Sequence, residues 1–381
     1  MAGAVERVTL THLQIPLKEP LRVSGGEVAI KDAILVAVET GHGIGLGECS
    51  PMTAGLVDPC DMPERCWDDL ALQIAPDLIG WAFGAVEEIA ERAEAWAGCS
   101  RFAVAGAETA CWDLLGQARH ATIAELLGAS LDQLDRGVES GLSLGLYPTI
   151  VELLRAIEAH MDEGYRRVKI RVRPGQDIEL VRAVRQHFGE ELPLMVDANG
   201  AYTSADLDVF RELDGFDLLM FEQPMAADDL DGLIALQKAV ATPVCLDETV
   251  GRPDKTAEAI RLGACRIVNL KLQRLGGFGP ALALHDLCYR HGVACWVGSM
   301  PELGVGQAQG IHLAALGNCK YPSDLQPSAR WFVDDIVVPL IEHAIPGLLR
   351  IPTRPGLGYL IDPAKVRRYQ VRHLEVTAPR G

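Results

Sequence analysis

Five short apolar runs in the middle of the chain each end in an ionisable residue: VKIR at 168–171, LMVD at 194–197, LMFE at 219–222, VCLD at 244–247 and IVNLK at 267–271. The end residues, spaced 24 to 26 positions apart, are Arg171, Asp197, Glu222, Asp247 and Lys271. A repeat of about 25 residues is one strand–loop–helix–loop unit of a parallel barrel of roughly 250 residues. Catalytic groups collect at the carboxyl ends of such strands, so we expect these five side chains to converge on one cavity.

These five end residues are called the ladder residues below. Predicted strands alternate with predicted helices before, between and after them. The run 138–146 is the expected first barrel strand, with helices at 149–163 and 176–189, and the sequence ACWVGS near 296 is the expected seventh strand. The run YPSDL, 321–325, lies at or near the eighth position. Alternating strands and helices indicate a parallel α/β sheet. About eight units with different end residues fit a closed barrel better than an open solenoid.

The first ~130 residues follow a different pattern. Residues 5–15 and 30–40 are rich in β-branched residues and predict strands, and a Pro- and Gly-bearing loop is expected between them. The runs 86–98 and 103–118 predict helices. We therefore expect an α+β unit over 1–132, a barrel over 133–345, and a tail, 346–381, that returns to the first unit.

Composition narrows the classes of protein. The 381 residues are 49% hydrophobic and 23% charged, as in an ordinary soluble globule. No apolar run reaches the roughly 18 residues of a membrane span, and we see no signal peptide. The net charge of −17 argues against nucleic acid or an anionic membrane as partner. Ten cysteines without a CxxC pair favour a reduced, cytoplasmic protein.

The three carboxylates of the ladder, Asp197, Glu222 and Asp247, suggest a metal site. A carboxylate at the end of a buried strand is costly unless it is paired or binds a metal. Three carboxylates suit Mg²⁺, for which Mn²⁺ could substitute, and no Cys/His set has zinc spacing. The alternative is that each one caps the helix that follows. The even spacing and the nearby lysines favour the metal site.

Three basic residues accompany the carboxylates. Lys271 is a candidate general base, because burial and neighbouring cations can shift a lysine toward neutrality. Lys169 is a candidate for the same chemistry, or a supporting contact. Arg171 is a poor base, because guanidinium stays protonated, and a good carboxylate clamp. The alternatives are an ion pair with a neighbouring carboxylate for Lys271, and a salt bridge to Asp197 or Glu222 for Arg171.

With its motifs taken together, the chain resembles the enolase superfamily, and specifically its muconate-lactonizing-enzyme subgroup. Within that subgroup it is most similar to o-succinylbenzoate synthases and N-acylamino acid racemases. The motifs are GLGECSP at 45–51, AETACWDLLGQ at 107–117, KIRVRPG at 169–175, VDANGAYT at 196–203, FEQP at 221–224, CLDET at 245–249, VNLKLQRLGG at 268–277, VGSMPELGVG at 297–306 and RPGLGYLID at 354–362.

This resemblance implies an α/β fold, a modified TIM barrel of (β/α)7β type with an N-terminal α+β capping domain. It implies Asp197, Glu222 and Asp247 as Mg²⁺ ligands and Lys271 as the lysine of the sixth strand. In the family, the metal binds a substrate carboxylate, a base removes the α-proton, and the metal stabilises the enediolate. The implied partner is a small-molecule carboxylate, and family members are commonly homo-oligomers.

The second strand departs from the family pattern. It normally carries Lys-x-Lys, whereas this chain has Lys169-Ile170-Arg171. Either Lys271 acts as the sole base, with Arg171 as electrophile or clamp, or Arg171 itself titrates, or the ancestral activity is lost. The alternatives are therefore a cycloisomerase or dehydratase with one base, or a catalytically silent binding protein. The seventh strand, ACWVGSMPE, has no histidine, which disfavours the mandelate-racemase branch.

The resemblance also places substrate specificity in two loops of the capping domain. Here these are about 17–27 and 50–60, and we expect them to accommodate a partly hydrophobic substrate side chain. Six residues at the barrel mouth are candidate substrate contacts: Ser143, Asn199, Ser299, Met300, Glu302 and Asp324. The alternative for each of them is an ordinary loop residue. The sequence leaves open whether racemisation, elimination or cycloisomerisation follows the shared enolate.

Overall fold

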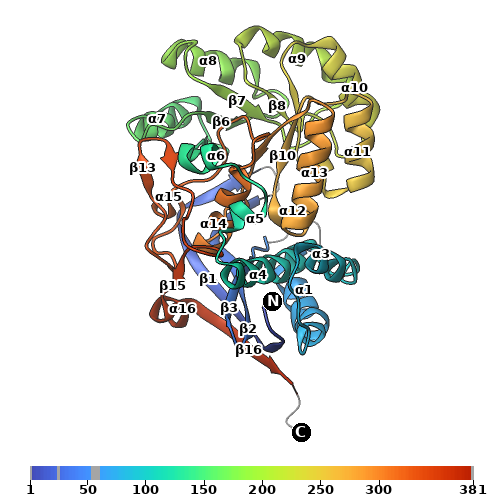
Figure 1. Cartoon of the computed structure of the whole chain (residues 1–381). Coiled ribbons are helices and arrows are strands. Elements are labelled where there is room, and N and C mark those ends of the chain that lie inside the picture. Colours follow the sequence, from blue (N-terminus) through green and yellow to red (C-terminus); the bar gives the residue numbers. More distant parts are fainter. Residues whose placement is uncertain (1, 24–25, 53–60, 379–381) are drawn as a thin grey trace.

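A seven-stranded parallel sheet forms the centre of the larger part of the molecule (Figure 1). The computed structural model describes residues 2–23, 26–52 and 61–378. The strands follow one another in chain order across the sheet: β5 (Leu142–Ser143), β6 (Val168–Arg171), β7 (Leu194–Asp197), β8 (Phe221–Glu222), β9 (Val244–Leu246), β10 (Ile267–Leu270) and β11 (Ala294–Val297). All seven predicted barrel strands are present, but the first, predicted over 138–146, is shortened to Leu142–Ser143, because Val138–Glu139 pairs instead with Leu348–Leu349 in a separate antiparallel sheet.

An irregular segment takes the eighth position and joins the two edges of this sheet. On one side, Cys295 N donates to Asn318 O over 2.9 Å and Asp324 N donates to Val297 O over 2.8 Å. On the other side, Gly141 N donates to Ser323 O over 2.7 Å. The run at 321–325 therefore closes the barrel as predicted, although it does so through single bridges rather than as a regular strand.

Helices follow the barrel strands and cover the outside of the sheet (Figure 1). α7 begins after Thr149, whose side chain and that of Glu152 form a capping box, and its apolar face buries Leu153 and Ile157. The other barrel helices are α8 (Ile178–Phe188), α9 (Leu207–Leu213), α10 (Leu230–Ala239), α11 (Pro253–Arg261), α12 (Leu272–Leu275), α13 (Phe278–Arg290) and α14 (Gly304–Ala314); α7 spans Ile150–Met161.

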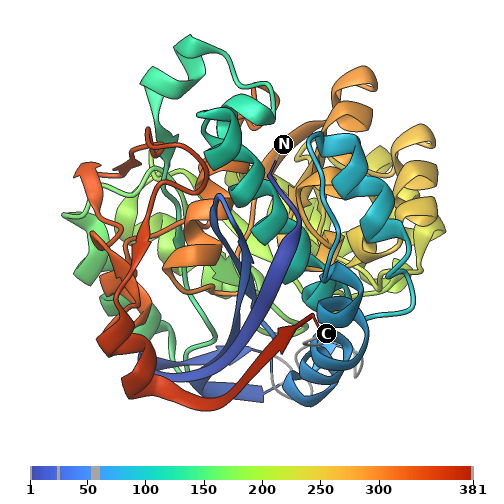
Figure 2. The same ribbon diagram turned by 60° about the horizontal axis from the view of Figure 1, so that its bottom comes forward.

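The N-terminal unit is built on a four-stranded antiparallel sheet of order β16-β1-β2-β3. Its strands are β1 (Val5–Val23), β2 (Gly26–Thr40), β3 (Gly43–Cys49) and β16 (Gln370–Thr377). Its helices are α1 (Pro63–Asp69), α2 (Ala75–Leu78), α3 (Val86–Glu94), α4 (Arg101–Arg119), α5 (Ile123–Leu126) and α6 (Leu131–Arg136). Figure 2 shows β16 along the edge of β1, where Leu10 pairs with Leu374. The chain's last strand thus returns to the first unit, as expected.

The prediction of a loop between the first two strands is wrong for most of its length. β1 and β2 continue through most of 17–27 as a hairpin, in which Leu21 pairs with Val28 after a register shift that begins at Pro16. A proline cannot donate to the ladder, and a bulge accommodates it without ending the strand. Most of the second predicted loop, 50–60, lies outside the described residues.

Close contact between α4 and β3 explains why two positions in β3 are glycine. A Cβ at Gly45 would lie 2.1 Å from the Ala110 carbonyl oxygen, and one at Gly47 would lie 1.9 Å from the Gly106 carbonyl oxygen. Only glycine permits this approach of helix to strand. α4 is buried along most of its length, because it packs against β3 on one side and contacts α12 and α13 of the barrel on another.

Several short elements lie outside the parallel sheet and its helices, one before the first barrel strand and the others after α14. They are β4 (Val138–Glu139), α15 (Ser328–Trp331), β12 (Val337–Val338), β13 (His343–Ile345), β14 (Leu348–Leu349), β15 (Leu360–Ile361) and α16 (Pro363–Tyr369). The predicted domain bounds, 132/133 and 345/346, remain a prediction.

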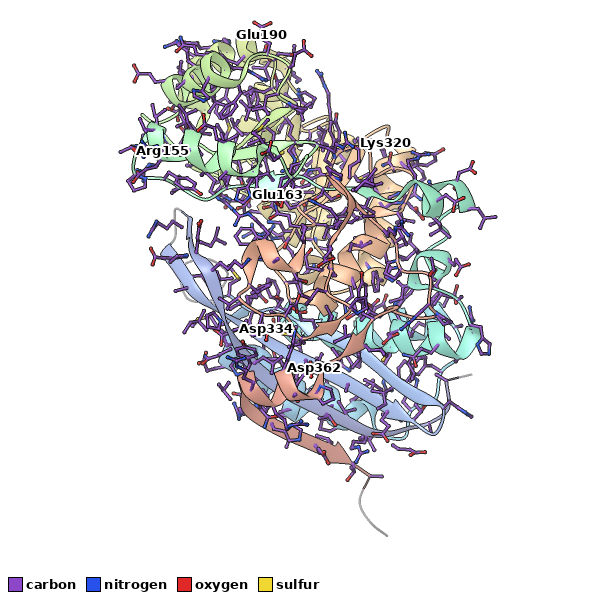
Figure 3. All side chains as sticks on the ribbon, turned by 90° about the vertical axis from the view of Figure 1, so that its left-hand side faces the viewer. Arg155, Glu163, Glu190, Lys320, Asp334 and Asp362 are labelled. Carbon is purple, nitrogen blue, oxygen red and sulfur yellow. The ribbon has the colours of Figure 1, made fainter. Side chains whose placement is uncertain are left out.

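Charged side chains lie on the outer surface, as Arg155, Glu190 and Lys320 show in Figure 3. Within the described residues, no helix is long and apolar enough to cross a bilayer. Every cysteine in the same part of the chain is free.

Candidate active site

Ion pairs hold the ends of β6, β7 and β8 together. In the sheet register, Arg171 lies opposite Asp197, and Asp197 lies opposite Glu222. Arg171 Nη1 is 3.0 Å from Asp197 Oδ2. Lys169 Nζ is 3.1 Å from Glu222 Oε2 and 3.7 Å from Asp197 Oδ2. The side chains of these three strand ends therefore meet, as the spacing predicts.

The ends of β9 and β10 meet in the same way. Lys271 Nζ donates to Asp247 Oδ2 over 2.8 Å. Arg274, one turn beyond Lys271 in α12, donates through Nη1 to the other oxygen, Asp247 Oδ1. Asn269 Nδ2 donates to Glu222 Oε1 over 2.7 Å and so links β10 to β8. The five ladder residues thus form one polar cluster at the carboxyl end of the sheet.

Asn269 and Arg274 are site residues that the sequence analysis missed. Asn269 precedes Lys271 by two positions, so the strand period of two places both side chains on one face. Arg274 follows Lys271 by three positions, which is the spacing of neighbours on a helix. Both signals lie in the motif VNLKLQRLGG, and periodicity around Lys271 could have revealed them.

Burial sets the protonation behaviour of Glu222. Asp197 and Asp247 are 1% exposed and Glu222 is 0% exposed. Burial, followed by the negative charge of Asp197, raises the pKa of Glu222 to about 8, although Lys169 opposes this shift. A carboxylate that is so costly to ionise without a strong partner is one that a cation would stabilise.

Asp247 and Glu248 behave differently from each other. Burial acts to raise the pKa of Asp247, but Arg274 and Lys271 outweigh it, and the pKa lies below its ordinary value. The neighbouring Glu248 has a raised pKa because of burial and the charge of Asp247. Its Oε2 atom is buried without a hydrogen-bond partner in the described structure.

The donor set fits a hard divalent cation in its chemistry. Three buried carboxylates supply oxygen atoms, which Mg²⁺ and Mn²⁺ prefer, and Glu248 adds an unpartnered carboxylate oxygen. Among the residues described, no three acidic, His or Cys side chains are grouped tightly enough to hold an ion as they stand. The ladder carboxylates face basic side chains or Asn269 instead, so binding a cation would draw them away from these partners.

Lys169 belongs to a second, fully buried cluster. Its Nζ is 2.6 Å from Asp324 Oδ2, and Arg167 Nη1 is 2.7 Å from Asp324 Oδ1. Both cations lie over the ring of Trp296. Burial opposes ionisation of Asp324, but Lys169 and Arg167 lower its pKa to about 2. Burial likewise acts to lower the pKa of Lys169, yet Asp324 and Glu222 outweigh it and the pKa is raised.

Arg171 has a second acceptor beside Asp197. Its Nη1 also donates to Asn199 Oδ1. Asn199 is held in turn, because its backbone N donates to Asp197 Oδ1 over 3.0 Å and its Nδ2 donates to Glu248 Oε1 over 3.1 Å. The salt bridge to Asp197, which the sequence offered as the alternative role of Arg171, is therefore present, and Asn199 is part of the polar cluster.

The remaining candidate contacts lie around this cluster. Ser143 ends β5 opposite Lys169 in the register. Ser299 Oγ donates to Glu302 Oε2 over 2.5 Å, so these two residues satisfy each other in the loop after β11. Met300 lies between them and is 6% exposed. The structure brings all three residues of this loop to the carboxyl end of the barrel, and their contact with a substrate remains a prediction.

Comparison with known proteins agrees with this geometry. Residues 5–128 match the N-terminal domain of the mandelate racemase / muconate lactonizing enzyme family, and residues 152–365 match the enolase C-terminal domain-like family. The chain is 38% identical to o-succinylbenzoate synthase of Geobacillus stearothermophilus, over 99% of this chain and 100% of that enzyme. It is 37% identical to N-succinylamino acid racemase of Amycolatopsis sp, over 92% and 93% of the two chains.

Solved structures show the same architecture. An enolase superfamily member from Listeria innocua Clip11262 aligns with a TM-score of 0.90 and 33% identity, covering 98% of this chain and 99% of that one. A dipeptide epimerase from Cytophaga hutchinsonii, solved with Mg and the dipeptide D-Ala-L-Val, aligns with a TM-score of 0.88 over 98% of this chain and 100% of that one; at 21% identity it shows the fold alone. The chain therefore belongs to the mandelate racemase / muconate lactonizing enzyme family of the enolase superfamily, whose o-succinylbenzoate synthase and racemase members are lyases and isomerases.

Proposed function

We propose that this protein is a Mg²⁺-dependent enzyme that removes a proton α to the carboxylate of a small molecule through an enediolate, as the o-succinylbenzoate synthases and N-acylamino acid racemases do. The observation that carries this proposal is the cluster in which Lys271 Nζ lies 2.8 Å from the buried Asp247 carboxylate, beside Glu222 and Asp197. A lysine next to three buried strand-end carboxylates is the arrangement that such proton abstraction needs.

Asp197, Glu222 and Asp247 are the proposed ligands of Mg²⁺, or of Mn²⁺ in its place. When bound, the cation would bind the substrate carboxylate and stabilise the charge that develops on it. The chain's own residues would do the rest. Asn199 and Asn269 orient Asp197 and Glu222 through hydrogen bonds, and the bulk of the barrel excludes water from the buried carboxylates.

Lys271 is the proposed base, and Arg171 is not a second one. A guanidinium keeps its protons in proteins, so Arg171 can orient Asp197 and stabilise negative charge but cannot take up the α-proton. Proton transfer is then confined to the face of the substrate that Lys271 meets. This observation favours, as a second candidate, a cycloisomerase or dehydratase of the same subgroup with Lys271 as sole base. A third candidate is a catalytically silent homologue that binds carboxylates and metal.

The setting of this activity is also part of the proposal. We expect a small-molecule carboxylate as substrate, no nucleic-acid or membrane partner given the charge of −17, a cytoplasmic location and a homo-oligomer.

Proton exchange in D₂O tests the proposal. NMR would follow loss of the α-proton signal with Mg²⁺ and a panel of N-acyl amino acids of both hands. We expect exchange in the wild type and in Lys320→Ala, an exposed control, and its loss in Lys271→Ala. Exchange of one enantiomer without inversion would support a single base. No exchange across the panel, with Mg²⁺ binding seen by calorimetry, would favour the silent homologue or another carboxylate class.

A further inference from the structure

A lysine of the antiparallel sheet is buried where the N-terminal unit meets the barrel. Lys31 lies in β2, and its side chain is 1% exposed. Its Nζ donates to the Met300 carbonyl oxygen over 2.9 Å and to the Ser50 and Pro51 carbonyl oxygens over 3.1 Å each. Met52 Sδ lies 3.4 Å from the same atom. One ammonium thus joins the segment 50–52 to the loop after β11.

Backbone carbonyls rather than carboxylates satisfy this ammonium. Within the described ranges, Lys31 forms no ion pair shorter than 4 Å. Burial lowers the pKa of Lys31, and the negative charges of Glu302 and Glu48 act against this shift and favour the charged form. Three carbonyl acceptors match the three N–H donors of a lysine. Without the cation, these oxygens would face one another in a buried space with no donor, which is unfavourable. The ammonium is therefore what allows the two segments to meet.

The segment that Lys31 holds is also tied to the chain just after the proposed base. Gln273 Nε2 donates to the Glu48 carbonyl oxygen over 2.8 Å, and Ser50 N donates to Gln273 Oε1 over 2.9 Å. The Glu48 carboxylate accepts from Leu303 N and Gly306 N, each over 2.8 Å, and so fixes the start of α14. The end of β3 is thus bonded to α12, which follows β10, and to the start of α14, which follows β11.

The loop that carries Met300 forms a wall beside Lys271. A Cβ added at Gly298, two residues before Met300, would lie 2.7 Å from Lys271 Cε. A shift of the Met300 backbone would therefore move the wall against which the Lys271 side chain packs. Errors of about 1 Å in such a position can cost a reaction on the order of 100-fold.

We propose that Lys31 is a positioning residue, whose ammonium fixes the segment Ser50–Met52 on Met300 and so sets the shape of the substrate pocket beside Lys271. This inference rests on the proposed function, because it assigns Lys31 to the enolate site. Lys31 does not contact the reacting atoms. It acts through the backbone of two loops that come from different domains.

Chemical rescue tests this role. Lys31→Ala removes the propylammonium part of the side chain and leaves a cavity lined by three carbonyl oxygens. We expect kcat/KM for α-proton exchange to fall by about 10- to 100-fold, and propylammonium ions to restore it. Tetramethylammonium, which has no N–H donor, should not restore it. Lys365→Ala is the matched control. Lys365 lies in α16, and its Nζ also donates to a backbone carbonyl oxygen, that of Asp335, over 2.8 Å.

Amide hydrogen exchange provides a readout that needs no turnover. Lys31→Ala should accelerate exchange in the peptides 48–52 and 299–303, and propylammonium should slow it again. If the wild type shows no α-proton exchange, the proposed function fails. Amide exchange then still tests whether Lys31 holds the segment Ser50–Met52 on Met300. A folded Lys31→Ala protein with unchanged kcat/KM and unchanged amide exchange in both peptides would overturn the inference. So would loss of cooperative unfolding in both Lys31→Ala and Lys31→Met, since Lys31 would then support the whole fold.

Discussion

Glu108 makes the junction of the two domains sensitive to pH. It lies in α4 and is 0% exposed. Its carboxylate accepts hydrogen bonds from Phe278 N over 2.9 Å, Gly279 N over 2.8 Å and Trp112 Nε1 over 2.8 Å. It therefore caps the N-terminus of the barrel helix α13 from the N-terminal unit. Burial nevertheless raises its pKa from 4.5 to about 7, and the three donors only partly oppose this shift.

The sign of the effect follows from this raised pKa. A folded state that binds the proton more tightly than the unfolded state is most stable below the unfolded pKa and loses that contribution as pH rises through the folded pKa. The window is thus from about 4.5 to about 7. One pKa unit corresponds to about 1.4 kcal/mol, so the free energy of unfolding that Glu108 contributes should fall by roughly 2 kcal/mol between pH 5 and pH 8.

Glu108→Gln removes the titration and keeps the shape. Urea unfolding followed by tryptophan fluorescence at pH 5, 6, 7 and 8 should show a shallower fall in stability for the variant than for the wild type. The variant should also be less stable at pH 5 by about 1–3 kcal/mol, because the side-chain NH₂ of glutamine would then face a backbone N–H that has lost its acceptor. The exposed Glu94→Gln should parallel the wild type. Parallel profiles for wild type and Glu108→Gln would refute the reasoning.

Three further outcomes test the fold and the site. Gly47→Ala should destabilise the protein by about 3 kcal/mol, measured by chemical unfolding, because its Cβ would meet the Gly106 carbonyl oxygen at 1.9 Å. Asp247→Asn should weaken Mg²⁺ binding by more than about 100-fold in calorimetry, whereas Asp254→Asn, in the exposed part of α11, should not. Arg171→Lys restores the family's Lys-x-Lys and should allow α-proton exchange with both enantiomers of a substrate that the wild type exchanges from one face; unchanged one-sided exchange would contradict the role given to Arg171.

The sequence predicts the barrel strands well because each one carries its own signal. An apolar run that ends in Asp197 or Asp247 specifies a buried strand and a polar end without reference to any other part of the chain. The same reasoning places the five ladder side chains together, since parallel strands end at one face. Their partners are harder to predict. Arg274 reaches Asp247 across 27 residues of sequence, and only the packing of α12 decides which carboxylate it meets.

Elements that depend on long-range contacts were also missed or shortened. The first hairpin continues past Pro16 because Leu21 and Val28 pair beyond the bulge, which local turn signals do not reveal. The eighth barrel position is irregular, since the segment that contains Ser323 and Asp324 joins its two neighbours through isolated bridges rather than through a continuous strand pairing. Lys31 lies in none of the sequence motifs quoted above. Its place becomes visible only when β2 and the loop after β11 are seen side by side.

The ion pairs and the protonation of the basic side chains decide which of them can accept a proton from a substrate. Lys169 is held by both Asp324 and Glu222 with a raised pKa, so it remains a cation and supports the closed barrel. Arg171 and Arg274 keep their protons because they are guanidinium groups. Among the residues that the structure describes, the one carboxylate paired with Lys271 is Asp247, which is also one of the proposed metal ligands. A ligand that draws Asp247 away would free both Lys271 and Arg274. Of these two only the lysine can give up its proton, and one such lysine on one side of the cavity is the physical reason to expect one-sided proton transfer.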